Sequence, residues 1–143
     1  MNNRKVLAGL IGEEIQGSSS PQMHQDEAAE HGLDLIYRLI DFAQPKREQS
    51  FLEPMLRAAE SLAFSGLNIT HPFKEDALKL VDTLSDDARR IGSINTIVFR
   101  DGQLHGDNTD WSGFADNFRA TLPEARLDRV ALIGTGGAGL DSR

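Results

Sequence analysis

The sequence predicts an α/β fold in which a mainly parallel sheet with one antiparallel hairpin forms the middle of three layers. Two observations support this prediction. Short apolar runs alternate with segments of helical periodicity, as in successive β-α-β units. An Asp-Gly pair at residues 101–102 lies between two strand-like segments, and this dipeptide is the strongest short signal for a hairpin. The length of 143 residues suits one such domain and the start of another.

The first part of the chain predicts a strand, a helix and a second strand. Residues 6–11 are nearly all apolar, as in a strand that is covered on both faces. Pro21 opens a helix that reaches about His31, and Gly32 can take the left-handed conformation after the helix end. Residues 35–42, with the sequence LIYRLIDF, are the second predicted strand.

A helix, a third strand and two further helices are expected next. Residues 51–64 carry apolar side chains at helical spacing, and residues 66–70 have the pattern of a strand. Pro72 marks the first turn of a helix that covers residues 72–84. A shorter helix is expected at residues 86–91.

The last part of the chain predicts the hairpin, a helix and a further strand. The hairpin strands are expected at residues 93–100 and 103–108, on either side of the Asp-Gly turn. A helix follows Asp110 and ends near Leu122. Residues 129–134, with the sequence RVALIG, are a final strand that leads into a glycine cluster.

The glycine cluster has the pattern of a nucleotide-binding turn. Gly134, Gly136 and Gly139 satisfy G-x-G-x-x-G directly after the predicted strand. The pattern requires a tight turn and a helix N-terminus that receives a pyrophosphate. The sequence contains neither that helix nor the acidic residue expected about 20 positions later. The pattern therefore predicts either the start of a Rossmann domain or a glycine-rich turn that binds no nucleotide.

Composition excludes several classes of function. The net charge of -7 and the scattered basic residues argue against a nucleic-acid partner. The chain has no cysteine, which excludes disulfides, a thiolate metal site and a cysteine nucleophile, and which suits the cytoplasm. No metal site is predicted. No apolar run approaches the ~20 residues that span a bilayer, so no membrane partner is expected.

Lys74 is the unusual residue of the segment GLNITHPFKED, residues 66–76. It lies beside the positive end of an expected helix dipole, where a cation is disfavoured. Shielding from water would disfavour its charged form further. Lys74 is therefore a candidate proton carrier. The alternative is a lysine that reaches solvent or pairs with a nearby carboxylate.

Hydroxyl, amide and carboxylate side chains cluster at other element ends. In the segment GSSSPQMH, Ser20 before Pro21 is a good helix N-cap, but the serines and the helix N-terminus also suit a bound carboxylate. Asn95 lies near the start of one hairpin strand. Thr109 and Asp110 lie where the other strand becomes a helix, and either can be an N-cap.

Five motifs in this order resemble the shikimate dehydrogenase family, including its quinate/shikimate dehydrogenase branch. They are GSSSPQMH, GLNITHPFK, IGSINTIV, GDNTDWSGF and LIGTGGAG. The resemblance implies a substrate-binding domain at residues 1–110 and a connecting helix at residues 111–128. It also implies that residues 129–143 are the start of an NAD(P)-binding Rossmann domain.

The resemblance also implies roles for individual residues. Lys74 and Asp110 match the catalytic pair. The residues that match ligands of the substrate are Ser18 and Ser20 for its carboxylate, and Asn68, Thr70, Lys74, Asn95 and Asp110 around its ring hydroxyls. The residues that match the phosphate turn for NADP, or for NAD, are Gly134, Gly136, Gly137, Ala138 and Gly139.

The activity that the resemblance implies is the NADP-dependent reversible reduction of 3-dehydroshikimate to shikimate, in the shikimate pathway. The 143 residues alone are expected to bind substrate with little or no catalysis. One alternative is a quinate/shikimate dehydrogenase that uses NAD or NADP, which His71 favours, whereas Ser20 favours shikimate. The other is a non-catalytic binding or interaction module, and formation of a homodimer stays open.

Overall fold

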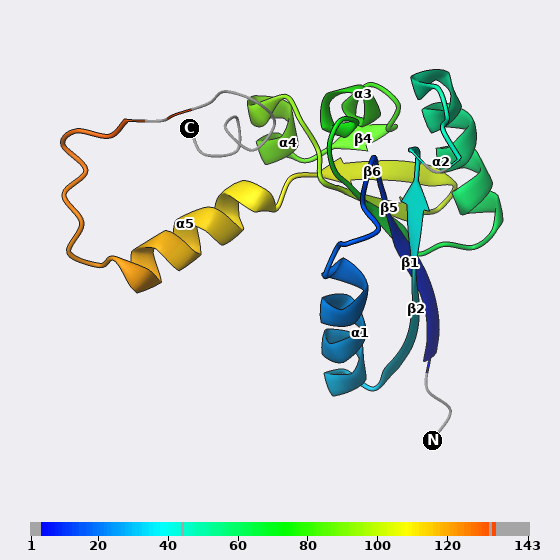
Figure 1. Cartoon of the computed structure of the whole chain (residues 1–143), viewed down its shortest axis with the longest axis horizontal. Coiled ribbons are helices and arrows are strands. Elements are labelled where there is room, and N and C mark those ends of the chain that lie inside the picture. The colour runs from blue at the N-terminus through cyan, green and yellow to red at the C-terminus, as the bar shows by residue number, and fades with distance from the viewer. Residues whose placement is uncertain (1–3, 44, 132, 134–143) are drawn as a thin grey trace.

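The sheet of the computed structural model has six strands in the order β2-β1-β3-β5-β6-β4 (Figure 1). The structure describes residues 4–43, 45–131 and 133. Strand β1 (Arg4–Gly12) pairs in parallel with β2 (Leu33–Asp41) and with β3 (Gly66–Ile69). Helices lie on both sides of the sheet, so that it forms the middle of three layers. The predicted α/β fold is confirmed.

The other half of the sheet is built around the hairpin of β5 (Thr96–Arg100) and β6 (Gln103–Asp107). Its turn has Asp101 at φ 55° and Gly102 at φ 70°, the left-handed pair that a type I′ turn requires. Strand β5 is also antiparallel to β3, a second antiparallel pairing that the sequence did not predict. It arises because the chain returns at the carboxyl end of β3, where Asn68 lies opposite Thr96.

The helices follow the predicted order. They are α1 (Ser20–Glu30), α2 (Leu52–Ser61), α3 (Lys74–Leu78), α4 (Asp86–Ile91) and α5 (Asp110–Thr121), with a short 3₁₀ helix η1 (Gln49–Phe51) before α2. Gly32 follows α1 at φ 66°, in the left-handed region, as predicted.

The helix predicted for residues 72–84 is wrong in extent. Helix α3 contains five residues, Pro72 lies before it in a turn, and the chain then forms β4 (Thr83–Leu84) parallel to β6. This segment is hydrogen-bonded to the edge of the sheet. The Asp82 N–H donates to the Leu104 carbonyl at 2.9 Å, and the Leu104 N–H donates to Asp82 Oδ2 at 2.7 Å. These long-range hydrogen bonds outweigh the helical spacing of the apolar side chains.

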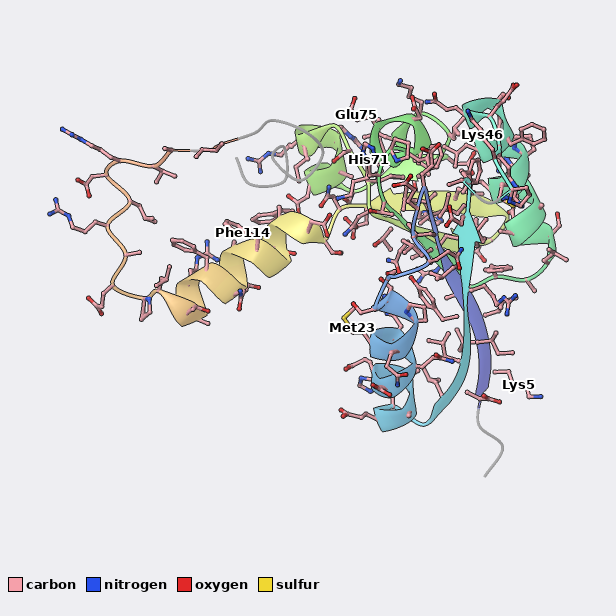
Figure 2. The ribbon with its side chains drawn as sticks, viewed as in Figure 1. Lys5, Met23, Lys46, His71, Glu75 and Phe114 are labelled. Carbon is pink, nitrogen blue, oxygen red and sulfur yellow. The ribbon has the colours of Figure 1, made fainter. Side chains whose placement is uncertain are left out.

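The strand predicted from Arg129 does not form across residues 129–131. A strand needs neighbours for its ladder hydrogen bonds, and no strand in the described part of the chain runs beside these residues. The predicted glycine turn at residues 134–139 lies outside the described residues. Helix α5 leads away from the sheet (Figure 1). None of its residues is buried, and the side chain of Phe114 is exposed (Figure 2).

The sheet has an apolar core on each face. Leu10 and Ile11 of β1 belong to different core clusters, as expected from alternation along a strand. The larger cluster includes Ile11 together with Phe42, Leu56 and Phe73. The smaller cluster joins Leu10, Ile15 and Tyr37. Within the described ranges no helix is long and apolar enough to cross a membrane.

Candidate functional site

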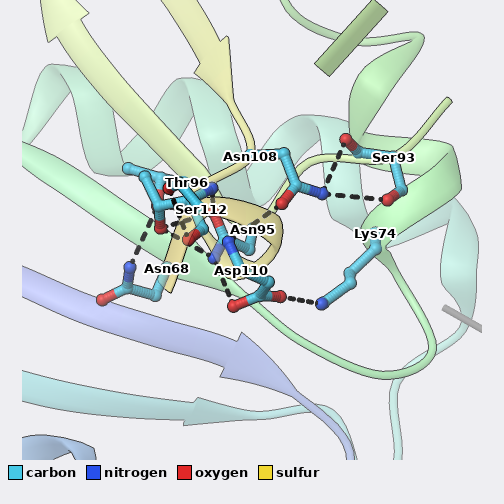
Figure 3. Close-up of polar contacts among 9 residues, drawn as sticks. Asn68, Lys74, Ser93, Asn95, Thr96, Asn108, Asp110 and Ser112 are labelled. Atoms are coloured by element: carbon cyan, nitrogen blue, oxygen red, sulfur yellow. Dashed lines mark hydrogen bonds and ion pairs between the residues drawn. The ribbon is translucent and has the colours of Figure 1, made fainter. Parts of the chain in front are cut away.

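An ion pair joins the first residues of two helices (Figure 3). Lys74 begins α3 and its Nζ contacts Oδ2 of Asp110, which begins α5. The Lys74 side chain is 15% exposed and that of Asp110 is 41% exposed. The structure therefore pairs the lysine with a carboxylate, one of the two arrangements that the sequence left open as alternatives to a proton carrier. The pair lies at a point where solvent still reaches the carboxylate.

Asn95 orients the other oxygen of this carboxylate. Its Nδ2 donates to Asp110 Oδ1 at 2.7 Å and to Thr109 Oγ1 at 3.0 Å, while its Oδ1 accepts the Thr109 N–H at 3.1 Å. The Asn95 side chain is thus used in both directions, and the residue is buried. The Asp110 N–H donates to Asn108 Oδ1 at 3.0 Å. The start of α5 is therefore attached to two buried amide side chains.

The segment at residues 93–95 also supports the lysine. The Ile94 N–H donates to the Lys74 carbonyl at 3.1 Å. Beside it, Asn108 Nδ2 donates to the Ser93 carbonyl at 3.2 Å and to Ser93 Oγ at 3.1 Å. Ser93 and Asn108 are buried, and their polar groups are satisfied within the protein. This arrangement fixes the backbones of Lys74 and Asp110 relative to each other.

Further hydrogen bonds run from Asn95 across the sheet. Thr96 Oγ1 donates to Asn95 Oδ1 at 2.9 Å, and Asn68 Nδ2 donates to Thr96 Oγ1 at 3.4 Å. The Tyr37 hydroxyl donates to Asn68 Oδ1 at 2.7 Å. The strands β5, β3 and β2 supply Thr96, Asn68 and Tyr37 respectively. One polar series therefore crosses the carboxyl end of β3.

Tyr37 continues the series to the serines at the start of α1. Burial raises the pKa of Tyr37 to about 12, against a hydrogen bond with the Ser20 side chain that lowers it. Ser18 Oγ donates to Ser20 Oγ at 3.0 Å and accepts the Ser20 N–H at 3.2 Å. His24 stacks on the Tyr37 ring, with centroids 4.8 Å apart and an interplanar angle of 12°. Ser18 and Ser20 are thereby connected to Asn68.

The N-terminus of α1 suits an anion. Its first turn contains no acidic residue, and the Ser19 side chain makes no capping hydrogen bond. Helix α4 differs, because Ser85 Oγ accepts the Ala88 N–H at 3.1 Å and two aspartates occupy the first turn. The partial positive charge at the N-terminus of α1 is thus left for another negative group.

Six of the seven predicted substrate-binding residues meet in this series. The structure joins Ser18, Ser20, Asn68, Asn95, Lys74 and Asp110. Thr70 lies outside the series: its N–H donates to the Ile11 carbonyl at 2.9 Å. The predicted phosphate-turn residues Gly134, Gly136, Gly137, Ala138 and Gly139 lie outside the described residues.

Tyr37 and Thr96 belong to the series but were not among the predicted site residues. A signal for Tyr37 was present, because it is the one tyrosine of the chain and lies in the strand predicted at residues 35–42. A buried tyrosine hydroxyl needs a hydrogen-bond partner, which places polar groups near it. The sequence did not show which partners those are.

Residues 10–97 match the family model described as the shikimate dehydrogenase substrate binding domain, and this match covers more than half of the chain. The chain belongs to the shikimate dehydrogenase family. The matched region contains the predicted site residues from Ser18 to Asn95, and Asp110 lies beyond it.

Individual relatives in the family agree with this assignment. Over 133 residues the chain is 47% identical to a shikimate dehydrogenase (NADP(+)) of Pseudarthrobacter chlorophenolicus, covering 93% of this chain and 45% of the relative. A quinate dehydrogenase from Corynebacterium glutamicum in complex with NAD has a TM-score of 0.90 at 41% identity, covering 96% of this chain and 49% of that one.

A third relative is a shikimate 5-dehydrogenase from Thermus thermophilus, solved in complex with NADP(H) and shikimate. It has a TM-score of 0.78 at 31% identity, with 96% of this chain and 50% of that chain covered. The chain spans about half the length of the curated relatives it matches.

Proposed function

We propose that this chain binds shikimate and 3-dehydroshikimate, and that the whole protein interconverts them with NADP. The observation that carries the proposal is the polar series from Ser18 and Ser20 to Lys74 and Asp110. Shikimate has a carboxylate on one side of its ring and hydroxyls on the other. The series offers hydroxyls and a helix N-terminus at one end, and amides with an ion pair at the other.

In this proposal the substrate is held by groups matched to its chemistry. Ser18, Ser20 and the N-terminus of α1 bind the carboxylate. Asn68 and Asn95 each have an amide that donates and accepts, which suits a hydroxyl. Thr70 is proposed to bind a further ring hydroxyl, on the resemblance of its motif alone.

Lys74 and Asp110 are proposed to move and direct the proton. Reduction of a ketone adds a hydride to the carbonyl carbon and a proton to the oxygen. The Lys74 ammonium donates that proton, becomes neutral, and takes another proton from solvent, to which its side chain is partly exposed. Asp110 holds the ammonium and accepts a hydrogen bond from the product hydroxyl.

A nicotinamide cofactor supplies or accepts the hydride when it is bound. The residues proposed to hold its phosphates, Gly134, Gly136, Gly137, Ala138 and Gly139, lie outside the described residues. We propose residues 1–110 as the substrate-binding domain, 111–128 as the connecting segment, whose helical part α5 ends at Thr121, and 129–143 as the start of the cofactor domain. The described part of this division is supported by α5, which leaves the sheet and buries none of its residues.

A second candidate is a quinate/shikimate dehydrogenase that uses NAD. The observation in its favour is the TM-score of 0.90 with the Corynebacterium glutamicum quinate dehydrogenase in complex with NAD. Quinate differs from shikimate in a saturated ring and one further hydroxyl, so the two ligands need different space beside the carboxylate.

Isothermal titration calorimetry of the 143-residue chain with shikimate and with quinate tests the binding proposal. Saturable shikimate binding that is lost in the Ser18→Ala/Ser20→Ala variant supports it. Ser61→Ala is the matched control, because the Ser61 hydroxyl donates to the Arg57 carbonyl on the exposed side of α2. A folded chain that binds neither ligand contradicts the proposal, and tighter binding of quinate favours the second candidate.

Steady-state kinetics of the whole protein test the proton transfer. Lys74→Ala is expected to lower turnover by about 10²–10⁴-fold, the range of general acid-base catalysis, with a smaller change in substrate affinity. Turnover close to that of the wild type would exclude Lys74 as the proton donor.

A further inference from the structure

A buried carboxylate lies beneath the loop that leads to the two serines. Asp41 ends β2, is 3% exposed, and receives four hydrogen bonds from neutral donors. Oδ1 accepts the N–H groups of Glu14 at 3.0 Å and Ala43 at 2.9 Å. Oδ2 accepts the Ile15 N–H at 3.2 Å and Gln16 Nε2 at 3.0 Å. Three of these four donors belong to residues 14–16, between β1 and Ser18.

Residues 12–18 adopt a backbone conformation that needs this support. Glu14 has φ 55°, in the left-handed region that favours glycine. Such a residue persists where surrounding contacts hold it, and the Glu14 N–H bonded to Asp41 is one of those contacts. The Glu13 N–H donates to the His71 carbonyl at 3.1 Å, so the loop also touches the segment before Lys74.

Ile15 transmits the position of the loop to the serines. Its N–H bonds to Asp41, while its carbonyl accepts the Ser18 N–H at 2.9 Å. Ser18 Oγ in turn accepts the Ser20 N–H. The Ile15 side chain belongs to the same core cluster as Tyr37, which bonds to the Ser20 side chain. The position of Ile15 therefore affects the serine hydroxyls in two ways, through the backbone hydrogen bond to Ser18 and through the packing against Tyr37.

We propose that Asp41 is a positioning residue that sets Ser18 and Ser20 for binding the substrate carboxylate. The inference rests on the proposed function for the identity of the ligand, and on the hydrogen bonds of residues 14–18 for the control of the loop. Asp41 itself is buried beneath the loop, at 3% exposure, and acts in this proposal through the loop and not by contact with the ligand. Nothing in the sequence motifs pointed to it, because three of its four partners lie 25 to 27 positions away.

Asparagine cannot replace this aspartate. Each carboxylate oxygen accepts two N–H groups, so either orientation of an asparagine amide turns its NH₂ toward two donors. Gln16 can rotate its own amide to accept from that NH₂. The backbone N–H of Ile15 cannot, and it loses its partner. The orientation that loses least therefore releases the residue that bonds to Ser18.

The test compares Asp41→Asn with the wild-type chain, using shikimate and its methyl ester. Calorimetry is expected to show about 10-fold weaker shikimate binding, since hydrogen bonds to charged groups contribute strongly. Binding of the ester, which has no carboxylate, is expected to change less than about 3-fold on the same ground. Asp82→Asn is the control, because Asp82 also accepts a backbone N–H at the edge of the sheet but lies outside the site. It is expected to leave both affinities unchanged.

Amide hydrogen exchange of the ligand-free chain gives a second readout. In Asp41→Asn the amides of Ile15 and Ser18 are expected to exchange at least about 10-fold faster, as local opening becomes easier, while those of α4 stay unchanged. Gln16→Ala removes one donor at an exposed position and serves if Asp41→Asn does not fold. It is expected to weaken binding of shikimate more than binding of the ester.

Equal weakening for shikimate and its ester, or no weakening at all, overturns the positioning role. Unchanged exchange at Ile15 and Ser18 overturns the control of the loop. A wild-type chain that binds neither ligand refutes the proposed function, and the exchange data then decide alone whether Asp41 holds the loop.

Discussion

Asn95→Asp tests whether a buried amide holds the Asp110 carboxylate. The substitution preserves shape but replaces Asn95 Nδ2, which lies 2.7 Å from Asp110 Oδ1, by a carboxylate oxygen. Two unit charges at this separation repel by about 1.5 kcal/mol in water and about 6 kcal/mol at an effective dielectric constant of 20. The Asp110 side chain is 41% exposed and Lys74 contacts its other oxygen, so the lower part of this range applies. We expect a loss of about 2–3 kcal/mol in the free energy of unfolding at pH 7.

The destabilisation by Asn95→Asp should depend on pH in a definite direction. Two adjacent carboxylates share a proton more readily than separated ones, so the folded variant binds more protons than the unfolded variant. Its stability relative to the wild type therefore rises as the pH falls. Urea unfolding followed by circular dichroism at pH 7 and pH 4 measures the difference.

Asn117→Asp, on an exposed face of α5, is the control and is expected to change the unfolding free energy by a few tenths of a kcal/mol at most. A change in Asn95→Asp below about 0.5 kcal/mol at both pH values would refute the reasoning, since this is the usual scale of a surface substitution.

Three further predictions follow from single groups. Tyr37, the one tyrosine, should titrate by tyrosinate absorbance with a pKa near 12 in the folded chain but near 10.0 in urea. The folded state then loses stability as the pH rises between these two values, and a midpoint near 10 in the folded chain would contradict the burial of the hydroxyl. Burial raises the pKa of Asp41, but its hydrogen-bond donors together lower it by more, so the folded state holds the carboxylate ionised to a lower pH than the unfolded state does. The difference in unfolding free energy between wild type and Asp41→Asn should therefore be present at pH 6 and shrink below pH 3.8, as measured by urea unfolding. A difference that does not change with pH would show that these hydrogen bonds do not stabilise the ionised carboxylate. In Gly12→Ala the new Cβ would lie 2.4 Å from Thr70 Cγ2 and 2.8 Å from Ile15 Cγ2, and we expect the free energy of unfolding in urea to fall by about 1–3 kcal/mol. In the control Gly17→Ala the new Cβ meets nothing within 4 Å and the loss should be smaller, so equal losses would contradict the close approach at Gly12.

The structure brings predicted site residues together where local motifs marked the ends of elements. Ser18, Lys74 and Asp110 each lie at or near the start of an element whose boundary the sequence marked by a proline, a glycine or a capping residue. The contacts among them were not predictable from spacing, because Lys74 and Asp110 are 36 positions apart and meet only when α3 and α5 are placed by the sheet. The role proposed for Asp41 was not predicted for the same reason, since residues 14–16 reach it only in the folded sheet.

The sequence by itself determined the alternation of strands and helices, the hairpin turn at Asp101 and Gly102, and the left-handed Gly32 that follows α1. These features depend on backbone sterics and on apolar periodicity within a few residues, which act in any context. The five ordered motifs also determined the family, which the comparisons confirmed.

Only the tertiary structure decided which segments pair and which polar groups meet. Residues 83–84 became a strand because β6 offered hydrogen bonds to them, although their apolar spacing favoured a helix. Tyr37 joined the serines to Asn68 because β2 and β3 lie on either side of β1. Such contacts depend on partners far away in the chain, and their free energy is gained only after the whole sheet has formed.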